Sequence, residues 1–151
     1  MDVHSDRRYS FDLDPDELWP LMVQVRSYRT WWPWLRACDA RSFEPGARWA
    51  CHVQPPLPYA VRFVITLDQI EPGAFASATI DGDIMGTARI DVTPAPFGSE
   101  LRLVSDLAPA NTLLRAVAMV ARPVAQMGHD WVLDTGLRQF RAKALPPAPA
   151  T

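Results

Sequence analysis

The last third of the chain constrains the fold most, because a long apolar helix follows directly on a strand-rich region. Residues 112–142 have helical character with one interruption at Pro123, and Asn111 is suited to cap the helix start. Residues 48–107 instead alternate apolar and polar side chains between turn sequences, as half-buried strands do. We therefore expect a curved antiparallel sheet that grips one long helix, an arrangement that leaves a cavity between them.

The part of this helix after Pro123 is apolar on two sides. One stripe consists of Val124, Met127, Gly128 and Trp131. The other consists of Leu133, Gly136, Leu137 and Phe140, and His129 extends it by four residues. A helix that is apolar on more than one side is surrounded by protein. Its two glycines predict either close backbone approach or room left for another molecule.

The N-terminal region predicts one strand followed by short helices. Residues 8–13 alternate polar and apolar side chains, which indicates a first strand with one buried face. Asp14 can cap the next helix, Pro15 suits its first position, and Glu17 can complete a capping box. We expect this helix to end near Arg26, and a second short turn before Pro33. The element order predicts the α+β class.

Size and charge restrict the classes of function. A chain of 151 residues with a formal net charge of −2 fits one domain and lacks an overall basic footprint for nucleic acid. We predict one domain over residues 1–144 and a disordered Pro/Ala tail over residues 145–151. No apolar run reaches the roughly twenty residues of a membrane span. The expected protein is cytoplasmic, has no transmembrane segment or nucleic-acid partner, and is a monomer or homodimer.

The cysteines and histidines do not predict a metal or a cofactor. Cys38 and Cys51 do not form a CxxC pair and are expected to be reduced thiols. His4, His52 and His129 lack ligand spacing with one another or with the cysteines, so no metal site is expected. Phosphate-loop and nucleophile-elbow motifs do not occur, and we predict no cofactor.

Four stretches of the sequence carry a family resemblance. They are WWPW at 31–34, PLPY at 56–59, GDIMG at 82–86, and GHDWV at 128–132 followed by Gly136 and Leu137. In this order they resemble the START-like (SRPBCC, Bet v 1-type) superfamily, and within it the polyketide cyclase/dehydrase-like lipid-binding proteins. The resemblance implies a helix-grip fold. In that fold an antiparallel sheet of about seven strands wraps around the C-terminal helix, with two short helices between the first two strands and an enclosed hydrophobic cavity.

The implied cavity leads to two hypotheses about small molecules. The first is non-catalytic binding of a lipid, polyketide or aromatic metabolite between the sheet and the helix. The second is a metal-free cyclase or dehydratase, with His129 as acid or base and Asp83 or Asp130 assisting. The superfamily uses one scaffold for carriers, receptors and enzymes, so the fold does not choose between them. We prefer binding, because catalytic motifs are absent and many relatives have Asn where this chain has Gly128.

A third hypothesis is a protein-interaction module that presents Trp31, Trp32 and Trp34 as an exposed patch. The alternative is that these rings cover one end of the core. For His129 the alternative to chemistry is a core histidine that is hydrogen-bonded to a carbonyl or carboxylate, and for Asp83 it is a solvated turn residue.

The predicted cavity walls are apolar or aromatic side chains on the strands and the last helix, because such side chains suit an adaptable pocket. The predicted wall residues are Trp49, Phe63, Ile65, Leu103, Met127 and Trp131.

Overall fold

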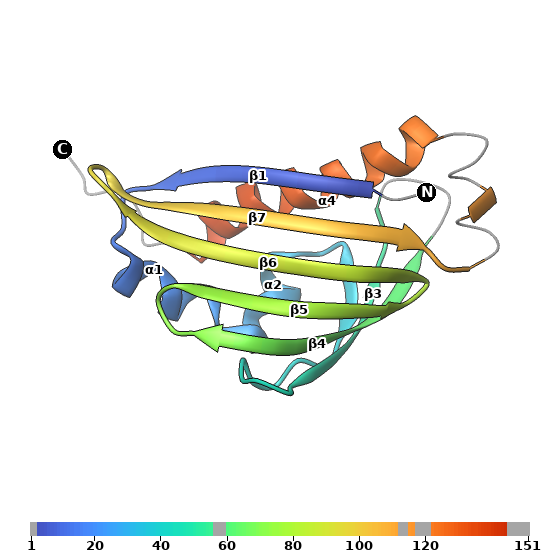
Figure 1. Cartoon of the computed structure of the whole chain (residues 1–151), viewed down its shortest axis with the longest axis horizontal. Coiled ribbons are helices and arrows are strands. Elements are labelled where there is room, and N and C mark those ends of the chain that lie inside the picture. The colour runs from blue at the N-terminus through green and yellow to red at the C-terminus, as the bar shows by residue number, and fades with distance from the viewer. Residues whose placement is uncertain (1–2, 56–59, 112–114, 117–121, 145–151) are drawn as a thin grey trace.

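The computed structural model describes residues 3–55, 60–111, 115–116 and 122–144, and it has a single curved antiparallel sheet (Figure 1). Seven strands of the described residues form this sheet in the order β1-β7-β6-β5-β4-β3-β2. The strands are β1 (Val3–Phe11), β2 (Leu35–Cys38), β3 (Arg48–Val53), β4 (Val61–Glu71), β5 (Phe75–Gly82), β6 (Ile84–Ala95) and β7 (Gly98–Pro109). The predicted α+β helix-grip fold is confirmed.

Short helices connect β1 to β2, as predicted. They are α1 (Pro15–Met22), the 3-10 turn η1 (Val25–Ser27) and α2 (Tyr28–Trp31). At the start of α1, the backbone N–H of Asp14 donates to the carboxylate of Glu17 at 3.2 Å, which is one half of the predicted capping box. The first helix ends at Met22, earlier than the expected Arg26, and the chain continues through the separate turns η1 and α2.

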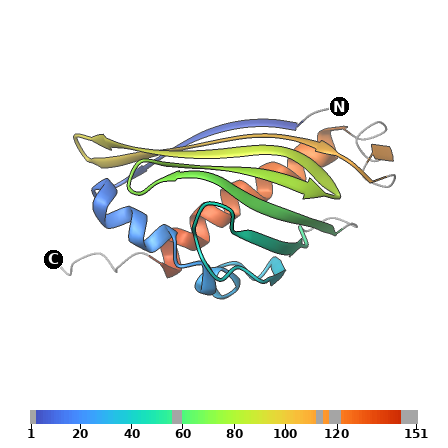
Figure 2. The same cartoon turned by 60° about the horizontal axis from the view of Figure 1, so that its bottom comes forward.

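The long helix α4 (Arg122–Lys143) crosses the inner, concave side of the sheet (Figure 2). Its 22 residues span about 33 Å at 1.5 Å per residue, longer than a typical strand of ~17–20 Å. Pro123, where the interruption was predicted, is the second residue of α4. Residues 112–114 and 117–121 of the expected helix, and the predicted tail 145–151, lie outside the described residues.

The tryptophan segment packs against α4 instead of forming an exposed patch. Trp31 is only 5% exposed, and Trp32 and Trp34 are half-buried. The indole N–H of Trp32 donates to the carbonyl of Gly136 at 2.8 Å, and that of Trp34 donates to Oε1 of Gln139 at 2.8 Å. An added Cβ at Gly136 would lie 3.3 Å from the Trp34 ring, so this glycine permits the close approach that was predicted. The low exposure contradicts the interaction-module hypothesis.

The glycines of the GDIMG stretch allow neighbouring backbones to approach. Gly86 has a φ of 153°, and a Cβ there would lie 1.8 Å from the carbonyl oxygen of Asp106 on β7. Gly82 has a φ of 138°, and a Cβ there would lie 2.7 Å from the carbonyl oxygen of Arg62 on β4. The stretch therefore shapes the β5–β6 hairpin and its two neighbours.

Two strands differ from the sequence-based expectation. β1 begins at Val3, five residues before the predicted start, because it pairs with β7 from Val3–Leu107 to Phe11–Ser99. β2 was not predicted from the residue pattern, because its four residues show no regular alternation of buried and exposed side chains. It forms by pairing with β3, so its partner and not its own sequence defines it.

Candidate functional site

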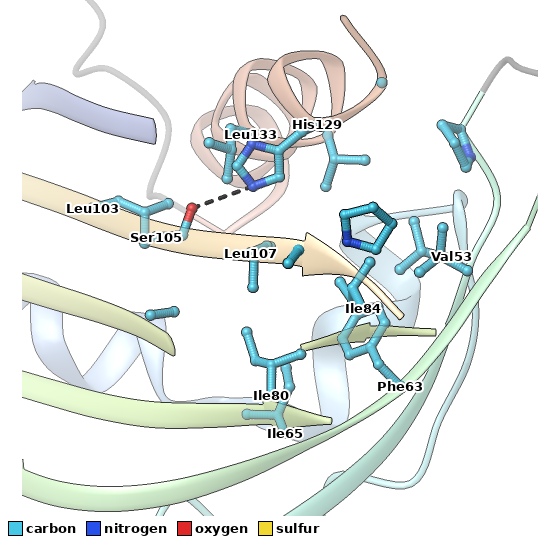
Figure 3. A pocket seen from close by; sticks show the side chains of 17 residues that line it. Val53, Phe63, Ile65, Ile80, Ile84, Leu103, Ser105, Leu107, His129 and Leu133 are labelled. Carbon is cyan, nitrogen blue, oxygen red and sulfur yellow. Dashed lines mark hydrogen bonds between the residues drawn. The ribbon is translucent and has the colours of Figure 1, made fainter. Parts of the chain in front are cut away.

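The concave face of the sheet and α4 enclose a cavity of about 250 Å³. Its lining residues come mainly from β3, β4, β5, β6, β7 and α4, and Figure 3 shows how the labelled side chains point into it. Strand residues alternate between the two faces of a sheet, so every second side chain of these strands reaches the interior. The walls are almost entirely apolar, and they include Val53, Phe63, Ile65, Ile80, Ile84, Leu103, Leu107, Val132 and Leu133.

Two further chambers adjoin this cavity. One of about 300 Å³ lies toward β2 and β3, and one of about 220 Å³ lies beside the tryptophan segment. Leu103 of β7 and Val132 of α4 line all three chambers. The interior is therefore a series of apolar spaces that meet at these two residues.

Two hydrogen-bonded polar side chains reach the 250 Å³ cavity. Among the described residues that line it, only Ser105 and His129 carry a polar side chain. Oγ of Ser105 lies 3.2 Å from Nε2 of His129, and Oγ of Ser5 lies 2.9 Å from Nδ1 of the same ring. Ser5 and Ser105 face each other across β1 and β7, and they are 5% and 4% exposed. The imidazole thus bridges two buried hydroxyls.

Burial sets the charge of this imidazole. Loss of solvent lowers the pKa of His129 below its ordinary value. The charge of Asp130 opposes this shift to a smaller extent, and the charge of Arg7 adds to it. The neutral ring prevails at pH 7, with one nitrogen as hydrogen-bond donor and the other as acceptor. Each serine therefore has a complementary partner in either tautomer.

An ion pair beside the imidazole holds α4 against β1. The guanidinium of Arg7 lies 3.0 Å from a carboxylate oxygen of Asp130 and 3.9 Å from one of Asp134. Arg7 does not line the 250 Å³ cavity, and two carboxylates offset its charge. Arg7 therefore serves the contact between α4 and β1.

Four predicted wall residues border the chambers. Phe63, Ile65 and Leu103 line the 250 Å³ cavity together with the predicted His129. Trp49 lines the 300 Å³ chamber. Residues from β3, β4, β7 and α4 thus surround one interior, because the curvature of the sheet turns its inward-facing side chains toward the same space.

Two predicted wall residues lie elsewhere. Met127 is 55% exposed, and Trp131 is half-buried with its ring 6.3 Å from that of Trp34. Neither borders any of the three chambers. Both are two positions from His129, which places them about 200° around the helix from it. The helix face that carries His129 faces the cavity, so the opposite face does not.

Asp83, the second candidate catalytic residue, does not line any of the three chambers. Its carboxylate accepts a hydrogen bond from the backbone N–H of Arg62 at 2.9 Å. Its backbone N–H donates to the carbonyl of Arg62 at 2.8 Å, and its own carbonyl accepts from the N–H of Ala110 at 2.8 Å. Asp83 therefore ties the β5–β6 hairpin to its neighbours.

The two serines are site residues that sequence analysis did not identify. Ser105 belongs to the inward-facing set Leu101, Leu103, Ser105 and Leu107, so a hydroxyl among leucines was a usable signal. Ser5 lies before the predicted first strand and gave no such signal. Only the pairing of β1 with β7 places it opposite Ser105.

The described residues hold no group of three or more His, Cys, Asp or Glu side chains that could bind a metal ion. Within the same residues, no helix has the length and apolar character required to cross a membrane.

The fold and the site define a class of helix-grip protein, in which a curved sheet and a long helix enclose an apolar cavity. The chain belongs to the SRPBCC family described as "Polyketide cyclase / dehydrase and lipid transport", whose model matches residues 3–144. A search of curated proteins found no match.

Solved structures share this fold at low sequence identity. Protein CV1439 from Chromobacterium violaceum has 13% identity and a TM-score of 0.69, over 96% of this chain and 99% of that one. Protein Ms6760 from Mycobacterium smegmatis has 14% identity and a TM-score of 0.68, over 93% of this chain and 89% of that one. The Bet v 1-like protein Ara h 8.0201 has 10% identity and a TM-score of 0.65, over 95% and 98%. At these identities the likeness concerns the fold alone.

Proposed function

We propose that this protein binds a hydrophobic small molecule in the cavity between the sheet and α4, and that an uncharged oxygen group of this molecule contacts Ser105. The observation that carries the proposal is the isolated Ser105–His129 pair in an otherwise apolar wall. Pockets for small molecules commonly combine apolar walls with a few polar groups that fix orientation. The family description, which includes lipid transport, agrees with such a ligand.

The bridging imidazole leaves Ser105 with spare hydrogen-bonding capacity. If Nε2 of His129 donates to Ser105, the hydroxyl proton of Ser105 is available to a ligand carbonyl. If Ser105 donates to Nε2, its oxygen can still accept from a ligand hydroxyl. The site therefore suits alcohols, ketones and esters alike.

The same site disfavours a carboxylate. No Arg or Lys side chain is present among the described residues that line the 250 Å³ cavity, and the neighbouring Arg7 is paired with Asp130. A carboxylate that enters an apolar space without a cation loses its hydration without compensation. We expect a fatty alcohol to bind more tightly than the fatty acid anion of equal length.

The experiment compares Ser105→Ala with Ser5→Ala. Both serines are buried and hydrogen-bond to the same imidazole, but only Ser105 lines the cavity, so Ser5→Ala controls for loss of stability. Displacement of the neutral dye Nile red by decan-1-ol, decanoate and decane at pH 8 measures affinity. In the wild type, decan-1-ol should displace the dye at lower concentration than decanoate.

Loss of one neutral hydrogen bond weakens binding by about 0.5–1.5 kcal/mol, roughly two- to twelvefold. Ser105→Ala should therefore weaken decan-1-ol by this factor and leave decane unchanged, and Ser5→Ala should preserve both affinities. If none of the three compounds displaces the dye or binds in native mass spectrometry, the cavity hypothesis fails. If decan-1-ol binds equally to both variants, the cavity holds ligands but Ser105 does not orient them.

A second candidate function is cyclisation or dehydration of a polyketide. The observation in its favour is that a neutral imidazole contacts a hydroxyl at the cavity wall, which gives a proton path from ligand to Ser105 to His129. His129→Gln should then abolish turnover of a β-hydroxyketone to the enone while a neutral alcohol still binds. Binding without any turnover by the wild type would leave ligand binding as the function.

A further inference from the structure

Two cysteines lie side by side at the wall of the 300 Å³ chamber. Cys38 of β2 and Cys51 of β3 are directly opposite each other in the antiparallel pairing. Their sulfur atoms are 3.6 Å apart, and both side chains line the chamber. Cys38 is half-buried at the edge strand, whereas Cys51 is buried.

The backbone geometry of this pair is compatible with a disulfide. Residues directly opposite in an antiparallel pair have Cα atoms about 4.5–5.5 Å apart, which lies within the roughly 4.4–6.8 Å span of disulfides. The two sulfurs must approach from 3.6 Å to about 2.05 Å, a change that side-chain rotation can supply. Formation of the bond therefore does not require the strands to move apart or change register.

The two thiols also differ in reactivity in a complementary way. The hydrogen bond from Cys51 lowers the pKa of Cys38 to about 7, although burial opposes this shift. The same hydrogen bond, together with burial, raises the pKa of Cys51. Near neutral pH, Cys38 is therefore the thiol of the pair that ionises more readily, and Cys51 is a protonated thiol held against it.

We propose that Cys38 and Cys51 are a reversible oxidation site, at which hydrogen peroxide converts the two thiols into one intramolecular disulfide between β2 and β3. In the first step the Cys38 thiolate attacks a peroxide oxygen and the O–O bond breaks. Cys38 becomes a sulfenic acid, and the departing hydroxide takes up the proton that Cys38 released and becomes water.

In the second step the Cys51 sulfur attacks the Cys38 sulfur, and the S–O bond breaks. The hydroxyl group leaves with the Cys51 proton as a second water. In total the two thiols lose two electrons and one peroxide is reduced to two waters. A dithiol reductant reverses the change by exchange.

The bond would fix the short edge strand β2 to β3 beside the chamber. β2 has only four residues, and its pairing with β3 contains a register irregularity between Leu35 and Ala37. The other edge strand, β1, pairs regularly with β7 over its whole length. A covalent link at Cys38 would therefore hold the edge strand whose pairing is shorter and less regular. This inference is independent of which molecule occupies the cavity.

The test is intact-mass spectrometry of the full chain after hydrogen peroxide and then iodoacetamide, with and without subsequent dithiothreitol. We expect a monomer that is lighter by two hydrogen atoms and carries no alkyl group at either cysteine, and full recovery of both thiols after reduction. Cys51→Ser is the matched control, because it leaves Cys38 without a second sulfur. Its peroxide product should be a heavier, oxygenated Cys38.

The proposal would be overturned if the wild type accumulated oxygenated Cys38 at the same rate as Cys51→Ser. A disulfide between two chains would overturn it as well.

The pH profile of iodoacetamide alkylation gives a second readout that does not depend on peroxide. Its midpoint at Cys38 should lie near pH 7 in the wild type and move upward in Cys51→Ala. An unchanged midpoint would show that Cys51 does not lower the pKa of Cys38, and this result would contradict the mechanism. Thermal unfolding of each variant verifies that it is folded.

Discussion

Ser5 and Ser105 lie directly opposite each other on β1 and β7, and one imidazole contacts both hydroxyls. The contact links α4 to the edge strand β1 and to β7, the strand that pairs with β1. His129 therefore has a structural role in holding α4 to the sheet as well as a position at the cavity wall.

The first prediction concerns stability. His129→Leu removes the partner of two buried hydroxyls, so it should lower the free energy of unfolding by about 1–3 kcal/mol in urea denaturation. Adding Ser5→Ala and Ser105→Ala should restore part of this loss, because apolar replacement of all partners leaves no unsatisfied group. If the triple variant is less stable than His129→Leu alone, the two serines do not depend on the imidazole.

The second prediction concerns pH. Burial lowers the pKa of His129 in the folded chain, so below the ordinary value of 6.5 the unfolded chain takes up a proton that the folded chain resists. The contribution of His129 to stability is fully present above pH 6.5, and it decreases as the pH falls from there toward the lower folded pKa.

Urea denaturation between pH 8 and 5 should measure this loss in the wild type. His129→Gln, which cannot titrate in this range, should show a smaller loss. A larger pH dependence in His129→Gln would contradict the assigned direction.

The third prediction concerns the junction of the chambers. Leu103→Trp replaces an aliphatic side chain with a larger indole ring where all three chambers meet. It should therefore reduce the amount of Nile red bound at saturation. Val104→Trp is the control, because Val104 neighbours Leu103 on β7 but faces the other side of the sheet. Equal dye binding by the two variants, measured by fluorescence titration, would show that the dye does not occupy the interior.

The fourth prediction concerns Gly86. Gly86→Ala places a Cβ against the backbone carbonyl of Asp106, so β6 and β7 must separate locally, and the protein should lose several kcal/mol or fail to fold. Gly46→Ala is the control, because Gly46 also has a positive φ of 86° but an added Cβ meets nothing within 4 Å. Its loss should be about 1 kcal/mol, from backbone strain alone. Thermal and urea unfolding distinguish the two, and similar losses would argue against the backbone clash.

Local sequence patterns determined most of the fold. Alternation along residues 61–67 and 101–107 depends on near neighbours, and so does the Asp14 cap. The structure has the corresponding strands β4 and β7 and the helix α1. One exception is β2, which has no clear alternation and exists through its pairing with β3. A strand of this kind cannot be recognised without its partner.

The candidate site depended on tertiary structure to a greater extent. The helix pattern identified His129 as a polar residue on an apolar stripe, but it could not decide which of the two apolar sides faces the cavity. The side that carries His129 and Leu133 faces it, so Met127 is exposed although the sequence made it an equal candidate. A helix that is apolar on two sides has no sequence signal for the choice, because packing against a distant sheet makes it.

The sequence by itself determined that a long apolar helix closes an antiparallel sheet, because the periods of 3.6 and 2 residues are local properties. Only the tertiary structure decided which polar atoms meet inside. Ser5 and His129 are 124 positions apart, and Cys38 and Cys51 are 13 apart on separate strands. Their contacts follow from strand register and helix placement, which arise from the burial of many side chains at once.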